Sequence, residues 1–76
     1  MNRNLVAATV TIDDGVNPEF TCSVDDLAAH LKALVPGAPE EVLAACDDLQ
    51  EAIEHNLPGI RETARFLDVT IIDIER

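Results

Sequence analysis

The sequence predicts a small α+β domain with an antiparallel or mixed sheet, built from an N-terminal strand or hairpin and a C-terminal strand. Two to three helices are expected to pack on one face of this sheet. Three observations favour this fold: alternating apolar residues in 5–12, helical spacing of apolar residues between 23 and 57, and a β-prone segment at 69–75. A chain of 76 residues with 47% hydrophobic residues is expected to form a single domain, residues 1–76, with one modest core.

The first strand is predicted over residues 5–12. Its apolar residues fall on one face and its threonines on the other, in the order Val6, Ala8, Val10 and Ile12 against Thr9 and Thr11. The sequence Asp13-Asp14-Gly15 that follows is typical of a tight hairpin turn, because Asp-Gly accepts a positive φ. A second segment, residues 16–22, then fits either an edge strand or an extended loop, because Pro18 has no N–H to donate.

A first helix is predicted to begin after Ser23. This serine and Asp26 have the spacing of a capping box, and Asp25 and Asp26 carry negative charge where the helix dipole is positive. The helix is expected to end at Pro36-Gly37. Its predicted apolar stripe consists of Leu27, Leu31, Leu34 and Val35.

A second helix is predicted from Pro39, which suits the first helical position, to Asn56, which tolerates the left-handed conformation that closes a helix. Pro58 prevents its continuation. This segment has the best helical pattern of the chain. Its apolar stripe is predicted to contain Val42, Cys46, Leu49, Ile53 and Leu57.

The last third of the chain is predicted to form a short helix and a strand. Residues 60–67 fit a short helix or an extended segment, and the spacing of Ile60, Ala64 and Leu67 favours the helix. Residues 69–75 are predicted to be a strand that is apolar on both faces, with Val69 and Ile71 on one and Ile72 and Ile74 on the other. Such a strand needs cover on both sides. Because helices are available for one face only, a second copy of the chain is a candidate for the other, with Val69 and Ile71 as candidate dimer-interface residues.

The chain is strongly acidic, with 15 Asp and Glu against 5 Lys and Arg, a net charge of −10 and a pI of about 4.2. This balance excludes direct binding of nucleic acid and of anionic membranes, which both require clustered cations. No apolar run approaches the ~18 residues of a membrane span, and we expect the N-terminal segment not to be a secretory signal, because its apolar run is short and rich in threonine. The spacing of Cys22 and Cys46 indicates no disulfide framework, so we expect a cytoplasmic protein with reduced thiols.

The negative charge is concentrated in residues 13–57, where eleven acids accompany Lys32 alone. The second helix carries most of it on the face opposite its apolar stripe. Like charges one turn apart cost about 0.2–0.5 kcal/mol per pair. The predicted partner-binding carboxylates are Asp13, Asp14, Asp25, Asp26, Glu40, Glu41, Asp47, Asp48, Glu51 and Glu54.

Two interpretations account for this charge. In the first, the carboxylates face a basic partner surface and take the place of nucleic-acid phosphates, helped by a helical turn of about 5.4 Å that is comparable to the phosphate repeat. In length, charge and lack of enzymatic motifs the chain is similar to phage-encoded anti-restriction and anti-CRISPR proteins, a resemblance that implies a non-enzymatic inhibitor of a larger complex. In the second, the chain is a small homodimeric module whose acids serve only solubility.

No motif predicts catalysis, a metal site or a cofactor. The residues Cys22, His30, Cys46 and His55 match no zinc spacing, and packing in the core or at its edge is the simpler explanation for Cys46 and His30. The run from Asp13 to Asn17 lacks the distal ligands of a calcium loop. Three glycines are too few for a phosphate-binding loop, and Ser23 is explained by helix capping.

Overall fold

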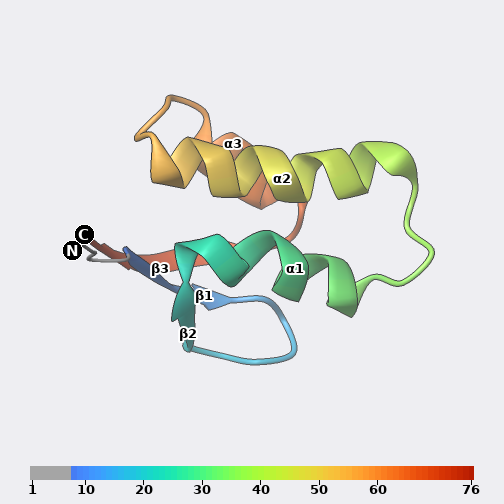
Figure 1. Ribbon diagram of the computed structural model, residues 1–76. Helices are drawn as coiled ribbons and strands as arrows, with labels where there is room; N and C mark the ends of the chain where they lie inside the picture. Colours follow the sequence, from blue (N-terminus) through green and yellow to red (C-terminus); the bar gives the residue numbers. More distant parts are fainter. Residues whose placement is uncertain (1–7) are drawn as a thin grey trace.

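A computed structural model describes residues 8–76, which form three strands and three helices (Figure 1). The strands make one antiparallel sheet with the order β2-β1-β3, which confirms the predicted α+β fold. Residues 5–7 of the first predicted strand lie outside the described range. The elements in chain order are β1 Thr9–Asp13, β2 Phe20–Ser23, α1 Val24–Leu34, α2 Glu40–Glu54, α3 Ile60–Phe66 and β3 Thr70–Glu75.

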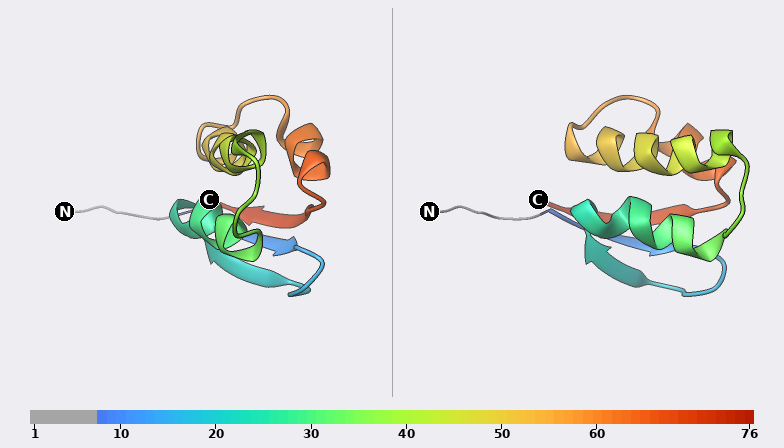
Figure 2. Two further views of the ribbon diagram at one scale, coloured as in Figure 1. Left: turned by 90° about the vertical axis from the view of Figure 1, so that its right-hand side faces the viewer. Right: turned by 45° about the vertical axis from the view of Figure 1, so that its right-hand side comes forward.

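The three helices lie on one side of the sheet (Figure 1). Helix α1 contacts β1 and β2, α3 contacts β3, and α2 packs against the other two helices. Helices α1 and α2 run antiparallel beside one another, as both views in Figure 2 show. One face of α2 therefore contacts the core while the opposite face is left to solvent.

The alternating pattern of the first strand is confirmed for the residues that the structure describes. Val10 and Ile12 are buried, with 1% and 0% of their surface exposed, and both belong to the core. The threonines point to the other face, where the hydroxyls of Thr11 and Thr21 lie 2.8 Å apart across β1 and β2.

The predicted tight hairpin is wrong. Six residues, 14–19, connect β1 to β2, although Gly15 has the expected positive φ of 85°. The second strand begins only at Phe20, because Pro18 cannot donate to a ladder and Glu19 has a left-handed φ of 52°. Of the two alternatives for residues 16–22, the segment is thus a loop up to Glu19 and an edge strand from Phe20.

The predicted start of α1 is confirmed, since the hydroxyl of Ser23 accepts a hydrogen bond from the N–H of Asp25 at 3.3 Å. Its end differs slightly from the prediction. The helix stops at Leu34, and Val35 follows with 39% of its surface exposed, so Val35 does not belong to the buried stripe. Leu27 and Leu31 are buried as predicted.

Helix α2 follows the predicted pattern closely. Cys46, Leu49 and Ile53 are buried, and Asn56 has the predicted left-handed φ of 53°. Leu57 is an exception, because the helix ends at Glu54 and leaves 44% of the Leu57 surface exposed. The short helix favoured for residues 60–67 is confirmed as α3.

Strand β3 has a β-bulge that changes the predicted faces. Ile12 pairs with Ile71 and Thr11 pairs with Asp73, so Ile72 is the extra residue. The predicted grouping of Val69 with Ile71, and of Ile72 with Ile74, is therefore wrong for Ile74. Ile71 and Ile74 both pack against the core, whereas Ile72 is 48% exposed.

Candidate functional site

Eight exposed carboxylates lie on α2 and in the first turn of α1. The buried residues of α2, including Cys46, Leu49 and Ile53, face the core. Because a helix turns about 100° per residue, its acidic residues fall on the opposite arc, and all of them are exposed. We define the acidic face as Glu40, Glu41, Asp47, Asp48, Glu51 and Glu54 of α2 together with Asp25 of α1.

The antiparallel packing of α1 and α2 determines where Asp25 and Asp26 lie relative to this helix. Two contacts fix the alignment: the N–H of Ala28 donates to Oε1 of Gln50 at 2.8 Å, and Nζ of Lys32 lies 2.9 Å from Oδ1 of Asp47. The N-terminus of α1 therefore lies beside the C-terminal end of α2 (Figure 1). This arrangement brings Asp25, which is one turn before Ala28 on the same side of α1, to the end of α2 that carries Glu51 and Glu54. Asp26 lies near Cys22 of β2 instead, where its charge raises the pKa of that thiol.

The charge of the acidic face is nearly uncompensated. Within residues 8–76, the contact between Lys32 and Asp47 is the one ion pair that a lysine or arginine makes with this surface. The last turn of α2 has no basic residue, so Glu51 and Glu54 stand near the negative end of the helix dipole. Repulsion along α2 is therefore a cost that the fold tolerates rather than a contribution to its stability.

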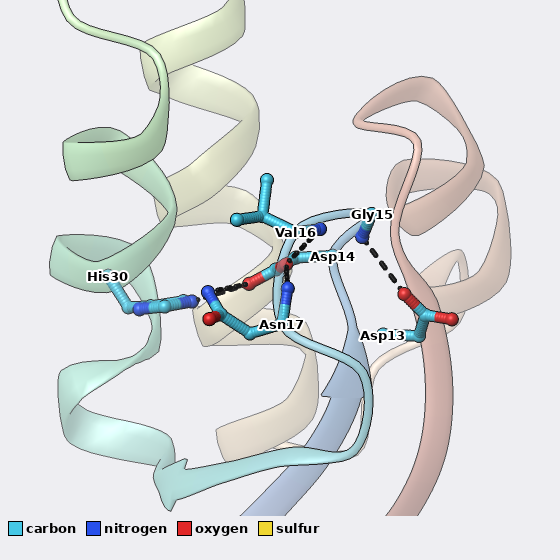
Figure 3. A network of polar contacts seen from close by, with 6 residues as sticks. All are labelled: Asp13, Asp14, Gly15, Val16, Asn17 and His30. Carbon is cyan, nitrogen blue, oxygen red and sulfur yellow. Dashed lines mark hydrogen bonds and ion pairs between the residues drawn. The ribbon is translucent and has the colours of Figure 1, made fainter.

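Asp14, in contrast, is held inside the β1–β2 loop (Figure 3). Its side chain has no exposed surface, and Oδ1 accepts hydrogen bonds from the N–H groups of Val16 at 2.8 Å and Asn17 at 2.6 Å. Oδ2 lies 2.7 Å from Nε2 of His30 on α1. Desolvation acts to raise the pKa of this carboxyl, but the hydrogen bonds from Asn17, His30 and Val16 outweigh it and hold the pKa well below its usual range.

The neighbours of Asp14 complete a structural clamp between the loop and α1. The ring of His30 stacks on Phe20 with centroids 4.0 Å apart and planes 10° from parallel. The carboxylate of Asp13 accepts the N–H of Gly15 at 2.9 Å. Asp13 and Asp14 thus both make contacts within the turn, and the structure does not place them with the acidic face of α2.

The clamp was not predicted from the sequence. Asp14 and His30 are 16 residues apart, and no local motif connects a turn aspartate with a helical histidine. The one available signal was the position of His30 at the edge of the apolar stripe, which correctly indicates packing. In catalytic sites an aspartate that contacts a histidine orients that histidine as a base next to a nucleophile. Here the contact joins the β1–β2 loop to α1.

The remaining nucleophile candidates from the sequence are the thiols of Cys22 and Cys46 and the hydroxyl of Ser23. Burial raises the pKa of the Cys46 thiol, and burial together with the charge of Asp26 raises that of Cys22, so both favour the neutral form. Ser23 caps α1.

In residues 8–76 no group of three or more His, Cys, Asp or Glu is arranged to hold a metal ion. Across the same range, no helix has both the length and the apolar character of a membrane span.

Of the two candidate dimer residues, Val69 immediately precedes β3 and Ile71 is its second residue. Val69 is 7% exposed and belongs to the core, and Ile71 is half-buried against the same core. The apolar residue of β3 that faces solvent most is Ile72. Because β3 is an edge strand, Ile72 is the apolar residue that a strand docking there would meet.

Comparison with known proteins gives no relative from which a function could be transferred. No protein-family profile, curated protein or solved structure shows significant similarity to the chain.

Proposed function

We propose that the protein is a non-enzymatic binding protein that uses its acidic face to occupy a basic nucleic-acid-binding surface on a larger protein or complex. Nucleic acid is then excluded from that surface. The observation that carries the proposal is the set of six exposed carboxylates along the single helix α2, of which only Asp47 contacts a cation in the described residues.

The charge density of α2 supports this proposal. A helix of 15 residues is about 22 Å long at 1.5 Å per residue. From Glu40 to Glu54 its six carboxylates are separated by five intervals that average about 4.2 Å along the helix axis, against ~3.4 Å per phosphate of one nucleic-acid strand. Cationic side chains spaced for phosphates would meet a comparable density of negative charge.

The rigidity of the helix supports it as well. Five buried residues fix α2 against the core, so its backbone is ordered before a partner binds. Binding then costs the ordering of side chains but not of a disordered segment. By this proposal the protein acts as an inhibitor of the phage anti-restriction or anti-CRISPR kind, inside the cell where nucleic-acid-binding complexes work.

Charge reversal on α2 is expected to abolish capture of the partner. The variant Glu40→Lys, Glu51→Lys, Glu54→Lys removes three exposed carboxylates and leaves Asp47 paired with Lys32. With immobilised protein and a lysate of the host cell, we expect the wild type to capture a basic protein at 50 mM salt and to release it at 500 mM, because charge attraction is screened. The variant should capture none.

A matched control separates the acidic face from net charge. Glu62→Lys, Asp73→Lys, Glu75→Lys changes the charge by the same amount at exposed positions on α3 and β3. Capture should survive in this control, and circular dichroism should show both variants folded. Equal capture by the wild type and the α2 variant would rule out the proposed function.

The alternative function, a homodimeric module whose acids serve only solubility, rests on the exposed Ile72 of edge strand β3. It predicts a dimer in analytical ultracentrifugation and no difference between the two triple variants. The proposed function through the acidic face predicts a monomer in the same measurement, because two copies of charge −10 repel each other.

A further inference from the structure

An apolar hollow of about 370 Å³ opens where α1 and α3 end and α2 begins. Five large hydrophobic residues in 8–76 are exposed, and three of them line this hollow: Val16 at 70%, Val35 at 39% and Phe66 at 60%. Exposed apolar side chains that cluster around one concavity are typical of a binding site. Exposed apolar side chains that are scattered singly over a surface are common in soluble proteins.

The floor of the hollow is the protein core itself. Leu31, Cys46 and Val69 line it and are each less than 8% exposed. A side chain that enters would therefore contact buried apolar atoms and lose its own hydration, which is the main source of affinity at such sites.

The clamp at Asp14 holds one wall of the hollow in place. Asp14 accepts the N–H of Val16 and contacts His30 on α1, so the loop that carries Val16 is tied to the helix that carries Leu31 and ends just before Val35 (Figure 3). The hollow therefore exists before any ligand binds. A preformed site needs less ordering on binding than a mobile one.

The charge around the hollow selects its occupant. Asp68 lines it and is exposed, no lysine or arginine is among its lining residues, and the first turn of α2, which carries Glu40 and Glu41, adjoins it through Val42. A second copy of the chain and an anionic lipid surface would both be repelled. A protein segment that presents an apolar side chain between lysines or arginines satisfies both the apolar floor and the acidic rim.

We infer that this hollow receives an apolar anchor side chain from a basic segment of the partner, next to the cations that contact the acidic face. The inference rests on the proposed function and adds a source of specificity to it. Carboxylates attract any cationic surface, whereas a buried anchor discriminates between partners of equal charge.

Two synthetic peptides of equal charge test the anchor. Acetyl-KKKLFKKK-amide carries an apolar pair, and acetyl-KKKSSKKK-amide replaces it with serines. In titrations followed by amide chemical shifts, we expect the apolar peptide to bind about tenfold more tightly, from burial of one large side chain. It should shift the amides of Val16, Val35 and Phe66, whereas the serine peptide should shift those of α2 only. Equal affinities and equal shifts for both peptides would overturn the inference.

Two single variants provide the matched comparison. Phe66→Ser removes an exposed wall of the hollow, and Ile72→Ser removes an exposed hydrophobic of similar accessibility outside it. We expect Phe66→Ser to lower the affinity for the apolar peptide about tenfold, to that for the serine peptide. Ile72→Ser should leave the affinity for the apolar peptide unchanged. The same loss in both variants would contradict a specific site.

The α2 triple-lysine variant distinguishes this inference from the proposed function. If it loses both peptides while Phe66→Ser has no effect, the acidic face stands and the anchor site is wrong. If it retains both peptides while Phe66→Ser loses the apolar one, the hollow binds without the acidic face and the proposed function is wrong.

Discussion

Replacing Leu49 with alanine is expected to lower the free energy of unfolding by about 2–5 kcal/mol. Leu49 lies in the middle of α2, has 0% of its surface exposed and belongs to the one core cluster. Alanine is the best helix former, so the loss reports packing rather than helix propensity. A domain of this size has a total stability of about 4–11 kcal/mol, so the variant is expected to lose a large part of it.

Urea denaturation at 25 °C, followed by circular dichroism, measures this effect. Leu57→Ala is the control, because the same side chain is deleted at a residue that is 44% exposed and lies beyond the end of α2. We expect the control to lose less than about 1 kcal/mol. Similar losses at both positions would mean that α2 does not pack as described.

Asp14→Asn is expected to destabilise the protein by about 1–3 kcal/mol at pH 7, because an amide can replace only one of two accepting oxygens in a buried site. The carboxylate accepts two backbone N–H groups and contacts His30. Asp13→Asn is the matched control, since that carboxylate accepts a single hydrogen bond, from Gly15, in an exposed setting. The Asp13→Asn variant is expected to lose less stability than Asp14→Asn.

The stabilisation from Asp14 should depend on pH. Its pKa in the folded protein is lowered, chiefly by the hydrogen bonds that overcome its desolvation, whereas in the unfolded chain it is about 3.9. The contribution is therefore complete above the unfolded pKa and is lost as pH falls through the folded pKa. In urea titrations, the gap between the wild type and Asp14→Asn should be smaller at pH 3 than at pH 7. A gap that widens at pH 3 would contradict the clamp.

Local patterns predicted the helices well, because each is determined by a few neighbouring residues. Ser23 caps α1, Asn56 adopts the left-handed conformation after α2, and the apolar stripe of α2 is buried over most of its length. The two stripe residues that are exposed, Val35 and Leu57, both lie just past a helix end. There the helical periodicity no longer determines where a side chain points.

Contacts that are distant in sequence were beyond prediction from local patterns. The bulge at Ile72 depends on how β3 pairs with β1, some sixty residues earlier, and a single extra residue moves Ile74 to the core side. The long β1–β2 connection likewise depends on the contact of Asp14 with His30. Asp-Gly permits a tight turn but does not require one.

For the candidate site, the sequence predicted the acids of α2 because their face follows from the position of the apolar stripe. It could not show that Asp25 lies beside them and Asp26 near β2, which depends on the antiparallel alignment of α1 and α2. It also could not show that Asp14 is buried. The apolar hollow was missed because its lining comes from the β1–β2 loop and the ends of three helices.

Displacement of nucleic acid from the captured partner tests the central claim most directly. The partner is first bound to a fluorescent oligonucleotide, and the protein is then titrated while anisotropy is recorded. We predict that the wild type returns the anisotropy to the value of free oligonucleotide, and that the variant Glu40→Lys, Glu51→Lys, Glu54→Lys does not. A ternary complex, in which the protein binds the partner and the anisotropy stays high, would show that the acidic face does not take the place of nucleic acid.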